Sequence, residues 1–100
     1  MTDRTKLPDV DFSNFALSLA ATAMVQLGIV PDPESGEAAE PNVLLARHTI
    51  DTLEMLRAKT RGNLDADESK LIDSLLYELR LRVVEVEGAR GGTGPGPTDG

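Results

Sequence analysis

The chain has 100 residues and a mass of 10.7 kDa, which allows one small domain. A chain of this size buries only about 60–65% of the surface that its unfolded form exposes, so the monomer should be marginally stable. The 17 acidic and 10 basic residues give a net charge of −7, which argues against binding nucleic acid or an anionic membrane through a basic face. The absence of cysteine excludes disulfides and thiolate metal sites.

Both ends of the sequence are expected to lie outside the folded domain. Residues 1–11 are mostly polar and predict a flexible arm, whereas residues 89–100 are rich in glycine and proline and predict a disordered tail. No apolar stretch follows the first charged residues, so we expect no signal peptide and a cytoplasmic location. The single domain is therefore assigned to residues 12–88.

Three apolar segments predict an all-α fold with helices at about residues 12–27, 41–60 and 66–87. Gly28, Gly62 and Gly88 follow these segments, where a left-handed glycine often ends a helix. Pro41 is expected in the first turn of the second helix, where its missing N–H costs nothing. Only residues 60–64 separate the second and third helices, which predicts an antiparallel hairpin.

The third predicted helix carries the clearest signals of its start and of its buried face. Asp65 precedes it and Glu68 follows three residues later, which is a capping box. Its apolar seam alternates spacings of four and three. The seam consists of Ile72, Leu76, Leu79, Val83 and Val86. The matching stripe on the second helix consists of Val43, Ala46, Ile50 and Leu53.

The first predicted helix is different, because no charged residue occurs from Phe12 to Pro31. Its polar stripe, with members spaced by four residues, consists of Asn14, Ser18, Thr22 and Gln26. The rest of the circumference is apolar, and such a helix is usually buried on most sides. Two other helices cannot surround it in so small a chain, so we expect a homodimer or higher oligomer to complete the core.

A second apolar row is predicted on the third helix, away from its buried seam, at Tyr77, Leu81 and Val84. Aligned apolar rows are more typical of contact surfaces than scattered apolar residues are. The candidate interface therefore consists of Phe12, Phe15, Leu19, Met24, Leu27, Tyr77, Leu81 and Val84. These residues favour a self-associating protein–protein interaction or structural module, which can also contact another protein.

Two other functions are compatible with the uncharged helix. The stripe from Asn14 to Gln26 could orient a small apolar ligand beside the helix, which would make the protein a carrier or sensor. A membrane segment is disfavoured, because a helix over residues 12–27 reaches only about 24 Å against a hydrocarbon core of about 30 Å. Basic, Trp and Tyr anchors are also missing from its flanks.

We recognise no constellation of catalytic residues, and we expect neither an enzyme nor a bound cofactor or metal. His48 is the single histidine, and Asp51 one turn later favours surface charge coupling over a ligand role. The alternation of Asn63, Asp65, Asp67 and Ser69 is like that of a calcium loop. Glu68 stands where that loop needs glycine, and a helix cap explains the same residues without a metal.

Three stretches of the sequence resemble a bacterial family of small proteins catalogued as domain of unknown function 1844. They are VDFSNFALSLAATAMVQLG at 10–28, PDPESGE at 31–37 and ARHTIDTLEMLRAKTRGNLDADESKLIDSLLYELRLRVVEV at 46–86. The resemblance covers about residues 7–86, nearly all of the predicted domain. It implies an all-helical bacterial cytoplasmic protein, and it carries over no activity, substrate or functional residue.

Overall fold

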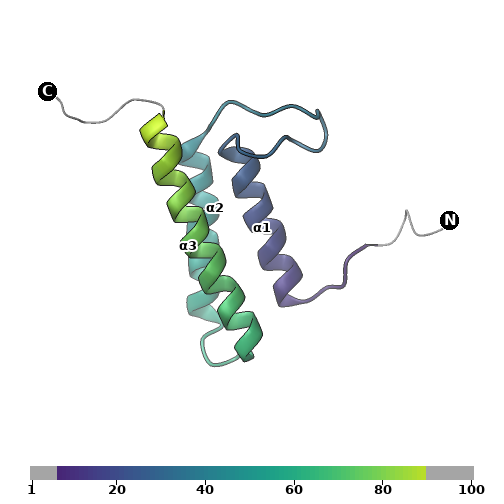
Figure 1. The fold of residues 1–100 in the computed structure, drawn as a ribbon. Helices are drawn as coiled ribbons and strands as arrows, with labels where there is room; N and C mark the ends of the chain where they lie inside the picture. Colours follow the sequence, from purple (N-terminus) through teal and green to yellow (C-terminus); the bar gives the residue numbers. More distant parts are fainter. Residues whose placement is uncertain (1–6, 90–100) are drawn as a thin grey trace, which may run out of the picture.

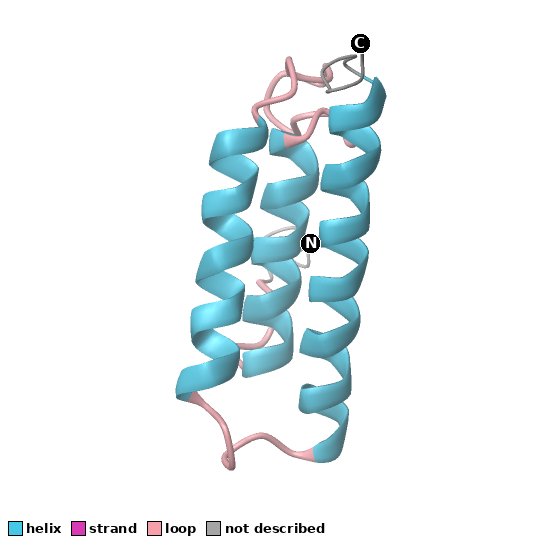
Figure 2. Cartoon of the chain, turned by 90° about the vertical axis from the view of Figure 1, so that its left-hand side faces the viewer, coloured by secondary structure: helices cyan, strands magenta, loops and turns pink. Residues whose placement is uncertain are grey.

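The computed structural model describes residues 7–89 and consists, within that range, of three helices and no strand. These are α1 (Phe12–Gln26), α2 (Val43–Lys59) and α3 (Ala66–Ala89). In Figure 1, α1 and α3 run in one direction and α2 runs in the other. Figure 2 shows that the three axes lie nearly parallel, and each helix contacts the other two. The predicted all-α fold and its α2–α3 hairpin are therefore confirmed.

The predicted capping box at the start of α3 is confirmed. The Glu68 N–H donates to the Asp65 carboxylate at 2.8 Å, and the Asp65 N–H donates to the Glu68 carboxylate at 3.0 Å. At the start of α1, the Asp11 carboxylate accepts from the Asn14 N–H at 2.8 Å. In both helices these bonds satisfy first-turn N–H groups that have no partner inside the helix.

The predicted start of α2 is wrong. Pro41 is not in the first turn, because the residue that follows it caps the helix. The Asn42 side chain accepts from the Leu45 N–H at 3.0 Å, and the Asn42 N–H donates to the Gln26 carbonyl at 2.7 Å. The latter bond ties the start of α2 to the end of α1, so the helix begins at Val43.

The third helix is found where it was predicted, but the expectation that a left-handed Gly88 ends it is wrong, since α3 continues through this residue to Ala89. Gly28 directly follows the C-cap of α1 in the left-handed conformation, with φ of 77°. Gly62 has φ of 86°, but it lies in the turn from Thr60 to Asn63, after α2 has ended at Lys59. Of the predicted arm and tail, residues 1–6 and 90–100 lie outside the described residues.

One apolar core collects residues from all three helices. Those of α2 and α3 are Ala46, Ile50, Leu53, Ile72, Leu76, Leu79 and Val83. They match the predicted seams, with Val43 and Val86 partly buried at the edge. The buried residues of α1 itself are three alanines, Ala16, Ala20 and Ala23, and its larger apolar side chains that contact the core are only partly buried. Because alanine has the shortest apolar side chain, this face lets the α1 backbone lie close to the hairpin.

The connection between α1 and α2 folds back onto the end of α1, as its path over the helix ends in Figure 1 shows. A Cβ atom at Gly28 would lie 2.7 Å from the Ala39 carbonyl oxygen, so the two backbones touch there. The Thr49 hydroxyl of α2 donates to the Gln26 side chain at 2.8 Å. These contacts fix the C-terminal end of α1 against the start of α2.

Ion pairs join α2 to α3 along one side of the hairpin. Arg47 pairs with Glu87 at 2.7 Å, and Arg57 pairs with Asp73 at 2.8 Å. Between them, Glu54 accepts hydrogen bonds from both Arg57 and Arg80. All these side chains are partly exposed, so each pair contributes little, and the network is the relevant unit.

The hydrogen bond from Arg80 is the main cause that holds the pKa of Glu54 below its ordinary value of 4.5, and the nearby charge of Arg57 adds to it. Because folding lowers this pKa, the contribution of Glu54 to the free energy of unfolding is fully present above pH 4.5. It is lost as the pH falls through the lowered value.

We predict that Glu54→Gln destabilises the protein at neutral pH and that its deficit against the wild type shrinks in acid. Urea unfolding across this pH range measures the difference. Glu34→Gln is the control, because that loop carboxylate makes no ion pair among residues 7–89. A Glu54→Gln deficit that stays constant into acid would contradict the role assigned to this carboxylate.

We also predict that Ala23→Leu lowers the free energy of unfolding by about 1–3 kcal/mol, because a larger side chain overpacks a close-packed interior. Ala23 is fully buried in the alanine face of α1. Urea denaturation at one fixed protein concentration gives the value. Ala58→Leu, at an exposed position of α2, is the matched control and should stay within about 0.5 kcal/mol of the wild type. Equal effects at the two positions would show that α1 does not pack closely.

Candidate interaction surface

The outward face of α1 carries apolar side chains that the bundle leaves open. Phe15 is 51% exposed and Leu17 is 44% exposed, and Ala21 one turn further is also exposed. Ile29 and Val30, which follow the helix, are exposed as well. This surface is uncharged throughout, since it belongs to the stretch from Phe12 to Pro31.

The predicted contact residues of α1 divide into three groups. Phe15 is exposed, as a contact residue must be. Phe12, Leu19 and Met24 are partly buried against the core, so only part of each side chain is open. The prediction that Leu27 is a contact residue is wrong. Leu27 is 1% exposed, because it lies at the C-cap of α1 in line with the buried alanines and packs in the chain's own core.

Leu17 is a surface residue that sequence reasoning missed. It lies in the same uncharged stretch as Phe15, and no charge on either side distinguishes an inward from an outward position. On the other helices, charged neighbours mark the outward side. The useful signal in α1 was the spacing of its alanines, which mark the close-packed face.

The predicted polar stripe of α1 does not converge on one site. The two hydroxyls in its middle are exposed and bond to the helix's own backbone: Ser18 donates to the Phe15 carbonyl at 2.9 Å, and Thr22 donates to the Ser18 carbonyl at 3.0 Å. Their hydrogen atoms are thereby committed. In the middle of the stripe, neither hydroxyl therefore has a free hydrogen-bond donor that an apolar partner would leave unpaired.

The ends of the stripe serve the fold. The Asn14 amide donates to the Asp9 carbonyl at 3.0 Å and to the Asp11 carboxylate at 3.2 Å. Gln26 accepts from Thr49, across the α1–α2 boundary. This arrangement supports a ligand-orienting role less well than it supports helix packing.

The apolar row on α3 is exposed, with Tyr77 71% and Val84 65% accessible and Leu81 at 40%. The row lines a groove of about 400 Å³ together with Leu76 and three charged side chains, those of Arg57, Asp73 and Arg80. These three charged side chains belong to the ion-pair network of the hairpin. The second surface is therefore apolar with a charged rim, unlike the neutral face of α1.

The back of α2 carries His48 between the exposed side chains of Leu44 and Met55. His48 and Asp51 are both exposed, and no hydrogen bond or ion pair joins them within the described part of the chain. In residues 7–89, no group of three or more potential metal ligands comes together. None of the helices in this range has the length and apolar character needed to cross a bilayer.

No match is found among curated proteins or among solved structures. The sequence profile of a family described as a domain of unknown function, DUF1844, matches residues 9–85. The matched range contains all of α1 and α2 and most of α3, that is, the whole bundle apart from the last turn of α3. The chain therefore belongs to the family of domain of unknown function 1844.

Proposed function

We propose that the protein is a self-associating interaction module whose contact surface is the outward face of α1. The observation that carries this proposal is that α1 is uncharged on every side, while the chain leaves the side of α1 opposite its alanine face exposed. A surface exposed to water as a monomer has no physical reason to exclude charge over a whole helix. A surface buried in a dimer does, because an unpaired charge there would cost several kcal/mol.

Closing this face against a second copy is energetically favourable for two reasons. Fully burying a Phe or Leu side chain contributes roughly 1.5–3 kcal/mol, and Phe15 and Leu17 are each about half open. The Ser18 and Thr22 hydroxyls already donate to their own helix, so burial strands no donor. The cost of removing polar groups from water is therefore small.

Beyond Leu17, the exposed residues of α1 are Ser18, Ala21 and Thr22, and all three are small. Small side chains let two helices approach closely. Because both copies would present the same face, we propose an isologous contact around a two-fold axis. The groove beside Tyr77 on α3, with its charged rim, remains open for a different protein.

We further propose that this association takes place in the cytoplasm of a bacterium, as the family resemblance implies. The carrier function is the less well supported alternative. The stripe that was expected to orient a ligand is instead bonded to the backbone, at Ser18 and Thr22, and to other side chains, at Asn14 and Gln26.

We predict that Ala21→Asp dissociates the oligomer without unfolding the bundle. Ala21 is exposed in the single chain, so the new carboxylate can stay solvated in the monomer but not in the contact. We expect the dissociation constant to rise by about 100-fold or more, since each tenfold corresponds to about 1.4 kcal/mol. Sedimentation equilibrium gives the constant, and circular dichroism shows whether the helices remain.

Ala58→Asp is the matched control, because Ala58 is an exposed alanine on α2 and the change in charge is the same. It should leave the mass of the assembly unchanged. A wild-type protein that stays monomeric at micromolar concentration would falsify the proposal. An assembly that both variants weaken equally would place the contact elsewhere than on α1.

A further inference from the structure

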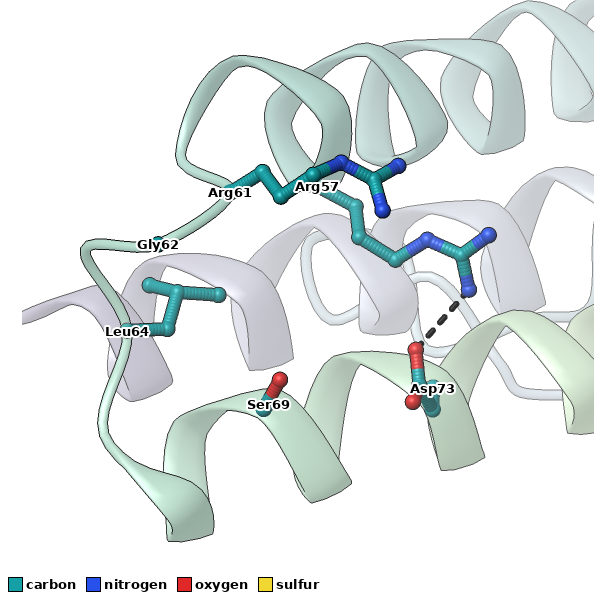
Figure 3. Close-up of a pocket in the computed structure, with 6 residues that line it drawn as sticks. All are labelled: Arg57, Arg61, Gly62, Leu64, Ser69 and Asp73. Atoms are coloured by element: carbon teal, nitrogen blue, oxygen red, sulfur yellow. Dashed lines mark hydrogen bonds and ion pairs between the residues drawn. The ribbon is translucent and has the colours of Figure 1, made fainter.

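A pocket of about 320 Å³ lies at the closed end of the α2–α3 hairpin (Figure 3). Its lining comes from the end of α2, the connecting loop and the first turns of α3, and consists of Arg57, Arg61, Gly62, Leu64, Ser69 and Asp73. None of these residues belongs to α1. The pocket is therefore independent of the proposed self-association surface.

The pocket holds two guanidinium groups, but only one of them has an acidic partner. Arg57 donates to Asp73 at 2.8 Å and to Glu54 at 3.2 Å. Arg61 makes no side-chain hydrogen bond or ion pair with any residue of the described range 7–89. Two positive groups and one negative group line the pocket, so its lining is net positive in a chain whose net charge is −7.

A hydroxyl donor faces the same space. The Ser69 side chain lines the pocket, and in Figure 3 its oxygen points toward the side where the two arginines lie. The hydroxyls of Ser18 and Thr22 donate hydrogen bonds to backbone carbonyls of their own helix, but the Ser69 hydroxyl makes no such bond within the described residues. Arg61 and Ser69 thus present uncommitted donors to one pocket.

The other walls determine what kind of molecule fits. Leu64 is partly buried and supplies an apolar wall. Gly62 adopts φ of 86° and has open space around the position of a Cβ atom, so the loop leaves this rim of the pocket uncovered. Asp73 adds one negative charge, which disfavours a doubly charged ligand.

We propose that this pocket binds the carboxylate of a small organic acid. Arg61 donates two N–H groups to the carboxylate in the planar geometry that suits this pair, and Ser69 donates its O–H. The alkyl part of the acid lies against Leu64. A single negative charge matches the net charge of the lining, whereas a phosphate dianion would meet Asp73.

The test is a titration of the full-length protein with sodium butyrate, at constant ionic strength, followed by the amide and arginine Nε–H resonances in NMR spectra. We expect saturable shifts at Gly62, Ser69 and the Arg61 side chain, with a dissociation constant in the millimolar range. Arg61→Gln should weaken binding by about tenfold or more, since it removes charge-assisted hydrogen bonds. Butylammonium, which has a similar chain and the opposite charge, should cause none of these shifts.

Lys70→Gln is the matched control, because it removes one positive charge beside Ser69 at an exposed position that does not line the pocket. It should leave the affinity for butyrate unchanged. Ser69→Ala, which changes no charge, should weaken binding less than Arg61→Gln does, and it keeps the test valid if that variant does not fold. Shifts that do not saturate, or an equal loss in the Arg61 and Lys70 variants, would overturn the proposal. Tighter binding of inorganic phosphate than of butyrate would overturn the assignment to carboxylates.

Discussion

The close packing of the alanine face of α1 on the α2–α3 hairpin is the constraint on which the rest of this molecule depends. The buried side chains of this face are small, so the helix backbone lies near its two neighbours. They are Ala16, Ala20 and Ala23. The larger apolar side chains, including Phe15 and Leu17, are then directed to the sides and outward. A helix that is apolar all round thus becomes one that is buried on one side and open on the other.

The two other helices are held together differently. α2 and α3 share a conventional apolar seam, and the ion pairs that run beside it connect Arg47 with Glu87 and Arg57 with Asp73. No charged residue lies in α1, so that helix takes no part in this network. It is held by apolar contacts and, at its C-terminal end, by the bonds of Gln26 to Thr49 and Asn42.

Much of the fold was predictable because local signals and periodicity agreed on α2 and α3. The Asp65 and Glu68 pair marked the start of α3, and the alternating seam identified its buried positions. The start of α2 was misplaced because Pro41 and Asn42 are adjacent and each is a plausible first residue of a helix. The cap that the Asn42 side chain makes on the Leu45 N–H and the bond of the Asn42 N–H to Gln26 decide between them. The inward side of α1 was not identified, since no charged residue marks the opposite side and the spacing of its alanines is the signal that distinguishes it. The hairpin pocket was missed because Arg61 and Ser69 come to line the same pocket only when the loop between α2 and α3 folds.

The uncharged character of α1 also determines how the molecule responds to ionic strength. Added salt screens solvent-exposed charges, so it weakens the partly exposed ion pairs of the hairpin. It has no charge to screen along α1, and excluded salts such as sulfate strengthen apolar burial. Rising sulfate therefore weakens the ion pairs between α2 and α3, while it strengthens the apolar contacts of all three helices, including those of α1. In this small bundle the ion pairs and the apolar contacts therefore depend on added sulfate in opposite directions.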